Sequence, residues 1–268
     1  MVRIVFSDID GTLLTDDKRV TEKTEQAVKA LLAKGIPFVL VSARMPEAIY
    51  PITEQMGVTI PLICYSGALV LTKEGKTLSS TAMEFSQTQG FLKEAGERFP
   101  QATINYYAGH HWYVRDAKDP RVVFEMEITG AKAEQAEFAA CLNKGILPHK
   151  ILMMMEPDDC ERAERELQEL FPALNIVRSF PTLLEIMDKS VTKASGIEVL
   201  LQHYGLTAAE SLSFGDNYND LEMLQYTKKS VAMGNAPQKV KAEASDVTSS
   251  NEEDGIYAYL VKAGLIDA

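Results

Sequence analysis

Short apolar runs alternate with stretches of helical periodicity over the first third of the chain. The runs that fit strands buried on both faces are residues 2–6, 37–41 and 62–65. The segment 21–34 has a helical apolar face, with Thr21 placed as its N-cap and Gly35 as its stop, and a second helix begins near residue 46. This alternation predicts a parallel sheet with helices on both faces.

The pattern changes after residue 68. Residues 73–76, Lys-Glu-Gly-Lys, have the composition of a turn, and they are flanked by the short segments 70–71 and 77–80. This pattern predicts that the two segments form a hairpin. Strand and helix candidates then follow in mixed order, at 86–99, 104–114, 122–128, 133–142, 151–155, 160–171, 176–179 and 181–187. This order predicts an α+β module of about a hundred residues.

From residue 192 the strand–helix alternation resumes and continues to a terminal helix that begins near residue 255. The intervening candidates are a helix to residue 204, strands at 212–214 and 230–232, and a helix at 238–244. We therefore predict an α/β fold with a doubly wound, Rossmann-like parallel-sheet core. Its core domain comprises residues 1–81 and 189–268, and residues 82–188 form an inserted α+β domain.

The composition limits the possible partners. The formal charge is −11 and no cluster of Lys and Arg stands out, which argues against a nucleic-acid or anionic-membrane surface. The uncharged stretch 55–72 is interrupted by Gly57, Pro61 and Gly67, so loop, strand and hairpin describe it better than a spanning helix. The three cysteines lack CxxC spacing and no targeting segment is visible, so we expect a cytoplasmic protein without disulfides.

Asp8 and Asp10 come directly after the first buried run. Ligand sites in open α/β sheets lie at the carboxyl ends of strands. Two close carboxylates repel each other unless a cation or proton compensates, and Mg²⁺ is the hard cation that oxygen ligands suit. The alternative is that both aspartates cap a turn in which Gly11 supplies an unusual dihedral angle.

Three further positions resemble this one. Asp216 and Asp220 follow the predicted strand 212–214, although Asp and Asn are also natural helix N-caps. Ser42 follows the run 37–41, where its hydroxyl and the amide of Ala43 could hold a phosphate oxygen or simply begin a helix. Lys193 lies near the start of another helix, and such a lysine is more often a solvated surface charge.

Taken together, these segments resemble the four motifs of the haloacid dehalogenase-like hydrolase superfamily, and most closely its Cof-type phosphatases of type IIB. The segments that carry the resemblance are Asp8-Ile9-Asp10-Gly11-Thr12, Ser42, Lys193 and Gly215-Asp216-Asn217-Tyr218-Asn219-Asp220. They cover the first 44 residues and about 183–234; the middle module matches in length and placement only. Two departures are Ser-Ala-Arg at 42–44 and Ser-Gly-Ala at 66–68, where relatives show Thr-Gly-Arg and Asn-Gly-Ala.

The resemblance implies a role for each residue. Asp8 attacks phosphorus and forms an aspartyl-phosphate, and Asp10 protonates the leaving group and then activates water. Mg²⁺ is bound by Asp8, the backbone carbonyl of Asp10 and Asp216, with Asp220 in support. The phosphate is held by Ser42, the amides of Ile9 and Ala43, Lys193 and Asn219.

The resemblance also implies that the middle module is a C2-type cap that encloses the site and reads the leaving group. Candidate reading residues are Tyr106, Tyr107, His110, His111, Trp112 and Arg115. An aromatic strand is otherwise a packing element, and this alternative stays open for each residue.

The function predicted is a Mg²⁺-dependent phosphatase that acts on small phosphorylated metabolites such as sugar phosphates, as a monomer or small homo-oligomer. A phosphomutase could use the same aspartyl-phosphate. A different class of protein, a non-catalytic sensor phosphorylated on Asp8, would share the acidic ligands and the lysine. Asp10 separates the hypotheses, because a stable phospho-aspartate sensor needs no acid/base two residues after the nucleophile.

Overall fold

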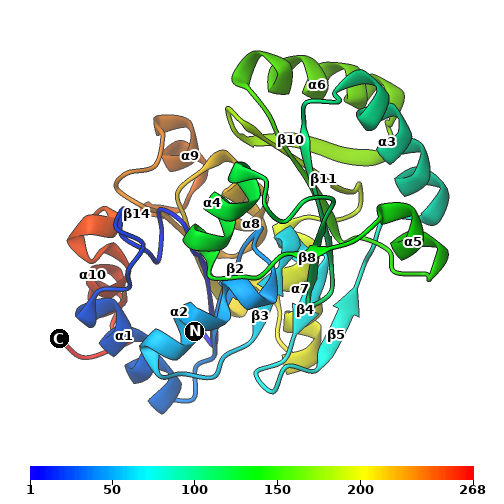
Figure 1. The fold of residues 1–268 in the computed structure, drawn as a ribbon. Coiled ribbons are helices and arrows are strands. Elements are labelled where there is room, and N and C mark those ends of the chain that lie inside the picture. Colours follow the sequence, from blue (N-terminus) through cyan, green and yellow to red (C-terminus); the bar gives the residue numbers. More distant parts are fainter. The chain divides into compact units, whose positions relative to one another are not determined.

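The computed structural model describes residues 1–268, which divide into two compact units. The first unit comprises Met1–Arg44, Ile49–Ser79 and Thr192–Ala268, and the second comprises Met45–Ala48 and Ser80–Val191. Figure 1 shows the blue N-terminal segments and the orange to red C-terminal segments within the first unit. Each unit has a sheet of its own.

The sheet of the first unit has the strand order β14-β13-β12-β1-β2-β3-β4-β5. These strands are β1 (Ile4–Asp8), β2 (Phe38–Val41), β3 (Leu62–Cys64), β4 (Leu69–Leu71), β5 (Thr77–Ser80), β12 (Ser211–Gly215), β13 (Lys229–Ala232) and β14 (Asp246–Val247). Strands β14 to β3 pair in parallel, and β4 is antiparallel to β3. The predicted α/β class with a parallel-sheet core is confirmed.

Helices accompany this sheet along the chain. They are α1 (Glu22–Ala33), α2 (Tyr50–Met56), α7 (Lys193–Tyr204), α8 (Leu221–Tyr226), α9 (Gln238–Glu243) and α10 (Gly255–Lys262). Single 3₁₀ turns of this unit are η2 (Tyr65–Gly67), η3 (Ala208–Glu210), η4 (Tyr218–Asp220) and η5 (Asn251–Glu253), while η1 (Pro46–Ala48) belongs to the second unit. Thr21 is the N-cap of α1 as predicted, because its hydroxyl accepts a hydrogen bond from the amide of Thr24.

Burial of apolar side chains holds the central strands in place. Ile4 and Phe6 of β1 pack in one cluster with Ile197 and Leu200 of α7. The intervening Val5 is also fully buried, so β1 is covered on both faces. A strand of this kind has its backbone fixed along its length, and its last residue, Asp8, is therefore held at a defined place on the sheet edge.

The sheet of the second unit has the order β10-β11-β9-β6-β7-β8 and is antiparallel except for the last pair. Its strands are β6 (Thr103–Ala108), β7 (His111–Val114), β8 (Glu134–Gln135), β9 (Lys150–Met154), β10 (Leu174–Phe180) and β11 (Leu183–Asp188). Its helices are α3 (Phe85–Arg98), α4 (Pro120–Thr129), α5 (Phe138–Asn143) and α6 (Pro157–Leu170). Alternate strand residues pack with α3, α5 and α6 into one apolar cluster.

Two local expectations are corrected, and one strand was not predicted. The helix expected from residue 46 begins at Tyr50, because residues 46–48 form only a 3₁₀ turn. The segment 133–142 holds both the two-residue strand β8 and the helix α5. Strand β14 has only two residues, neither fully buried, and the sequence carries no apolar run that would reveal it.

The uncharged stretch 55–72 contains β3, η2 and β4. No helix in the chain has the length and apolar character that crossing a membrane requires.

Candidate active site

The candidate site lies at the carboxyl ends of three neighbouring strands of the first unit. Asp8 is the last residue of β1, Ser42 directly follows β2, and Asp216 directly follows β12. Strand β1 pairs in parallel with both β2 and β12. The sheet therefore brings these three residues to one edge, although Asp8 and Asp216 are 208 positions apart in the chain.

Three carboxylates converge at this edge. Asp8, Asp216 and Asp220 each offer one oxygen atom, and these atoms all lie within 4.8 Å of one another. Asp8 and Asp220 are buried, while Asp216 is partly exposed. A set of carboxylate oxygens at this spacing fits a hard divalent cation.

Lys193 is the counter-ion that the structure supplies to this cluster. Its side chain is 1% exposed, and its ammonium donates hydrogen bonds to Asp8 Oδ1 and, at 2.6 Å, to Asp220 Oδ1. The lysine is therefore part of the site, and the alternative of a solvated surface charge is wrong. It is the first residue of α7, whose N-cap Thr192 forms a capping box with Ser195.

Gly67 lies against the first residues of α7. A Cβ atom at this position would lie 2.1 Å from the carbonyl oxygen of Thr192, the residue before Lys193. The φ angle of Gly67 is also +111°, which other residues rarely adopt. A glycine here therefore allows the close approach that carries the lysine into the cluster.

The charge balance of the cluster is unfavourable without a further cation. Burial raises the pKa of Asp8 well above its usual value; the charge of Lys193 opposes this rise, and the charges of Asp220 and Asp216 add to it. Burial also raises the pKa of Asp216 to about 6. Burial by itself would lower the pKa of Lys193, but Asp220 and Asp8 raise it and keep the ammonium charged. One ammonium faces three carboxylates, and a divalent cation would offset the remaining repulsion.

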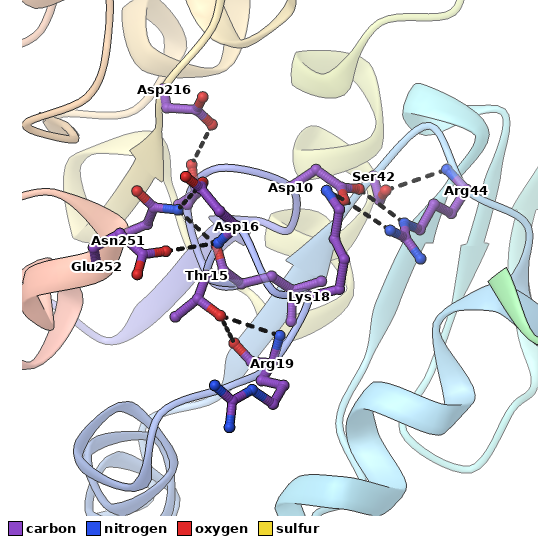
Figure 2. Close-up of polar contacts among 12 residues, drawn as sticks. Asp10, Thr15, Asp16, Lys18, Arg19, Ser42, Arg44, Asp216, Asn251 and Glu252 are labelled. Atoms are coloured by element: carbon purple, nitrogen blue, oxygen red, sulfur yellow. Dashed lines mark hydrogen bonds and ion pairs between the residues drawn. The ribbon is translucent and has the colours of Figure 1, made fainter. Parts of the chain in front are cut away.

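The carboxylate of Asp10 is not one of these three, and it pairs with two cations, Arg44 and Lys18, as Figure 2 shows. Arg44 donates from Nε to Oδ2 at 2.8 Å and from a terminal nitrogen to Oδ1 at 2.7 Å, and Lys18 Nζ lies 3.0 Å from Oδ1. Burial alone would raise the pKa of Asp10, but the hydrogen bonds and charge of Arg44, with a further part from Lys18, lower it. The ionised carboxylate is therefore the stable form in this arrangement.

A second set of contacts fixes the loops that carry Asp216 and Asp220. Thr12 Oγ1 donates to Asp216 Oδ1 at 2.7 Å, and Asp220 Oδ2 accepts from the amides of Asp216 and Asn217 at 2.9 and 3.0 Å. A Cβ atom on Gly11 would lie 2.4 Å from Asp216 Oδ2, and Gly11 has a φ angle of +83°. Gly11 therefore allows the Asp8 loop to approach the Asp216 loop closely.

The predicted phosphate-binding residues differ in how they are placed. The Ser42 side chain is buried, and its Oγ accepts a hydrogen bond from the amide of Arg44 at 3.2 Å, which leaves the hydroxyl proton to be donated. Ile9 has a buried side chain and Ala43 lies next to Ser42. Asn219 lies exposed on η4 beside Asp220, and no hydrogen bond joins it to the acidic cluster.

The residues of the second unit that were expected to recognise the leaving group fall into a buried set and an exposed set. Tyr106 is fully buried, stacks on Phe138 and donates its hydroxyl to the carbonyl of Ile146, so it is a packing residue. Trp112 is buried and donates Nε1–H to Asn105 Oδ1 at 2.9 Å. Tyr107 is buried and stacks on Trp112, with 5.5 Å between the ring centroids. The guanidinium of Arg115 lies over the ring of Phe138. His110 and His111 are exposed, and each contacts a glutamate, Glu47 and Glu134 respectively.

Residues that sequence reasoning missed surround Asp10. Arg44 and Lys18 bind its carboxylate, yet the sequence predicted no role for either one. Arg44 stands two positions after Ser42, and this spacing is a signal that could have found it. Lys18 carries no such signal, because its contact depends on a tight turn in which it adopts a φ angle of +59°.

Comparison with known proteins gives consistent results along the whole chain. The profile of the haloacid dehalogenase-like hydrolase family matches residues 5–260. A protein from Haemophilus influenzae, whose name proposes a phosphatase, is 38% identical over 256 residues, which are 96% of this chain and 96% of the relative.

Solved structures agree with this match. A haloacid dehalogenase-like hydrolase from Bacteroides thetaiotaomicron is similar with a TM-score of 0.89 and 25% identity, covering 98% of this chain and 100% of that one. A HAD subclass IIB sugar phosphatase is similar with a TM-score of 0.81 and 25% identity, covering 99% of this chain and 100% of that one.

Proposed function

Because the chain belongs to the haloacid dehalogenase-like hydrolase family and is a phosphatase of that family, we propose that it hydrolyses small phosphorylated metabolites with Mg²⁺ and an aspartyl-phosphate on Asp8. The observation that carries the proposal is the position of Lys193, whose ammonium contacts Asp8 and Asp220 beside Asp216. This arrangement joins a nucleophile to the positive charge that a phosphate dianion needs in order to approach a carboxylate.

Asp8 is the proposed nucleophile. Its side chain is 8% exposed and its backbone is held at the end of β1, so the carboxylate has little freedom to move. In the first step an oxygen of Asp8 forms a bond to phosphorus while the bond from phosphorus to the leaving oxygen breaks. Lys193 holds Asp8 in place and contributes charge that offsets the repulsion between the two anions.

The residues fit a magnesium ion. Asp8 and Asp216 would supply carboxylate oxygens and Asp10 its backbone carbonyl, with Asp220 in support. When bound, Mg²⁺ would neutralise charge on the transferring phosphoryl group and help to orient it. The fit rests on the three oxygen ligands within 4.8 Å and on the raised pKa values of Asp8 and Asp216.

Asp10 is the proposed acid and base. It would give a proton to the leaving oxygen in the first step, and then take a proton from the water that attacks the phosphorus of the aspartyl-phosphate. That attack breaks the bond to Asp8 and releases inorganic phosphate. The pairing with Arg44 and Lys18 favours the ionised form that the second step needs. A phosphate dianion bound nearby shifts the balance towards the protonated form that the first step needs.

The phosphate would be held by donors at the same sheet edge. Ser42 offers its hydroxyl proton, the amides of Ile9 and Ala43 lie in the two strand-end loops, and Lys193 and Asn219 come from α7 and η4. The second unit is proposed as the C2-type cap that reads the leaving group. A sugar phosphate is the proposed substrate class, in line with the subclass IIB sugar phosphatase whose fold the chain shares. The cytoplasm is the proposed location.

The test is phosphate release from a panel of phosphorylated metabolites, measured with Mg²⁺ and with EDTA. We expect release that EDTA stops, that Mg²⁺ restores, and that Asp8→Asn abolishes. The matched control is Asp267→Asn, which changes an aspartate whose side chain is 97% exposed and should leave release unchanged. Release that is indifferent to EDTA would refute the metal, and an active Asp8→Asn enzyme would refute the nucleophile. Phosphorylation of Asp8 without turnover of any substrate would favour the sensor hypothesis instead.

A further inference from the structure

We propose that Asn235 and Asn251, two asparagines of the C-terminal part of the chain, are positioning residues for Asp10. The inference rests on the proposed function, since it concerns the residue to which that function assigns the acid/base role. It goes beyond the four sequence motifs, because Asn235 and Asn251 both lie outside them. Both residues act on the loop between β1 and α1, which covers residues 9–21 and carries Asp10.

Hydrogen bonds within this loop give it a local shape, but they do not by themselves set its position relative to the rest of the first unit. The carbonyl of Ile9 accepts hydrogen bonds from the amides of Thr12, Leu13 and Leu14, which makes a compact turn directly around Asp10. Beyond the turn, the chain reverses between Thr15 and Arg19, where it places Lys18 on the carboxylate of Asp10. Both parts project beyond the end of a strand, so their position depends on what they contact elsewhere.

Asn235 binds the start of the loop. Its Nδ2 donates to the carbonyl of Gly11 at 2.8 Å, and its Oδ1 accepts from the backbone amide of Asn251 at 3.2 Å. Gly11 follows Asp10 directly in the chain. The exposed side chain of Asn235 therefore donates one hydrogen bond and accepts another, and so connects Gly11 to η5.

Asn251 binds the far side of the same turn. Its side chain is 6% exposed, and Nδ2 donates to the carbonyl of Leu14 at 3.0 Å, with Asp16 Oδ1 at 3.4 Å. The adjacent Glu252 accepts a hydrogen bond from the amide of Asp16 at 2.6 Å. Figure 2 shows Asn251 and Glu252 beside Asp16, and Lys18 and Arg44 directed towards Asp10.

The two carbonyls that these asparagines hold are those that border Asp10. Gly11 follows Asp10 in the sequence, and Leu14 pairs with Asp10 in an isolated β-bridge. Asn235 and Asn251 therefore bind the backbone at two positions that adjoin Asp10. Their side-chain amides donate hydrogen bonds to carbonyl oxygens. A water molecule could form hydrogen bonds of similar energy with these carbonyls, but it would not hold the loop at a fixed position.

A small displacement of an acid/base group is costly for the rate of a reaction. Loss of about 1 Å in alignment can reduce a rate on the order of a hundredfold. Substrate binding depends on the phosphate contacts of Ser42 and Lys193, which come from other elements. Loosening the Asp10 loop should therefore lower kcat far more than it changes KM.

The experiment compares Asn235→Ala and Asn251→Asp with the parent enzyme. Asn235 is exposed, so its replacement should leave the fold intact, and Asp is close in shape to Asn but removes the donated hydrogen bonds. The matched control is Asn143→Ala, which changes an exposed asparagine at the end of α5. Two quantities are measured for each variant: kcat and KM on the best substrate of the panel, and amide hydrogen exchange of residues 9–19 by mass spectrometry.

We expect faster exchange across residues 9–19 in both variants, with kcat lower on the order of tenfold to a hundredfold and KM changed by less than about threefold. The control should match the parent in both measurements. Unchanged exchange in Asn235→Ala would overturn the inference, as would faster exchange with an unchanged kcat. The hydrogen-exchange measurement does not depend on turnover, so it separates the two proposals. An inactive parent enzyme would refute the proposed function. Unchanged exchange in the variants would refute the contacts proposed for Asn235 and Asn251.

Discussion

The guanidinium of Arg44 binds the carboxylate of Asp10 with two hydrogen bonds, from Nε to Oδ2 at 2.8 Å and from a terminal nitrogen to Oδ1 at 2.7 Å. Only 15% of the Arg44 side chain is exposed, so the pair is shielded from water on the arginine side. A planar guanidinium fixes both the position and the plane of a carboxylate, whereas an ammonium supplies charge without orientation. The proposed acid/base is therefore held in one orientation by its neighbour from the loop after β2.

We predict that Arg44→Lys lowers kcat on the order of tenfold while the enzyme remains folded, because the charge survives but the two-point contact does not. Steady-state kinetics and a thermal melt of the same sample check this. Arg165→Lys, on the exposed surface of α6, is the control and should behave as the parent. A fully active Arg44→Lys enzyme would show that the orientation of Asp10 does not depend on this contact.

Lys193 allows a prediction for stability as well as activity. Replacement by Met keeps the length of the side chain but leaves three clustered carboxylates without their ammonium. Removing one partner of a buried ion pair costs about 3–5 kcal/mol in the free energy of unfolding. Activity should also fall by on the order of a hundredfold or more, because a fixed charge at the transferring group is lost.

Urea denaturation with and without Mg²⁺ measures the stability of Lys193→Met. Mg²⁺ should restore more stability to the variant than to the parent, since a divalent cation would offset the same repulsion. Lys239→Met, at an exposed position of α9, is the matched control. If Lys193→Met were as stable and as active as the parent, the charge balance described for this site would be wrong.

The sequence allowed the fold class and the positions of the acidic residues to be predicted for a physical reason. Strand β1 is apolar on both faces, so its end could be located, and Asp8 follows from that end. The same reasoning located Asp216 after β12. The place of Lys193 could not be derived from its own helix, because its burial depends on contacts with distant segments, such as those with Asp8 and Asp220 and the close approach of Gly67 to Thr192.

The remaining contacts at the site depend on tertiary structure that no local pattern reveals. Asn251 meets Leu14 across 237 positions of sequence, and nothing in the residues around either one indicates the pairing. In the second unit the alternation of a strand predicts that Tyr106 and Tyr107 face opposite sides. It does not say which side the helices cover, and the packing of Tyr106 on Phe138 is known only from the structure.

His149 provides a prediction for the pH dependence of stability. Its ring is buried in the second unit, with Nδ1 accepting from the amide of Gly109 at 3.0 Å and Nε2 lying 2.8 Å from Ser80 Oγ. Burial, with a smaller part from the charge of His110, lowers the pKa of His149 from 6.5 to about 4. Between these two values the unfolded chain binds the proton and the folded chain does not.

The stability contributed by neutral His149 is therefore present above pH 6.5 and is lost as the pH falls towards 4. His149→Asn cannot titrate in this range, and its Oδ1 can still accept from Gly109. The free energy of unfolding of the parent should fall by about 2 kcal/mol more than that of the variant between pH 7 and pH 5. Chemical denaturation at both pH values gives the difference directly, and parallel losses in the two proteins would contradict the assignment.

The central claim is that Asp8 carries the phosphoryl group during turnover. The most direct measurement is acid quenching of the Asp10→Asn variant during reaction with the best substrate and Mg²⁺, followed by mass spectrometry of the peptide that contains Asp8. Because the second step would lack its base, we predict that this peptide gains the mass of one phosphoryl group, and that Asp8→Asn never does. Substrate turnover by Asp10→Asn without any phosphorylated Asp8 peptide, or with the label on another residue, would contradict the account.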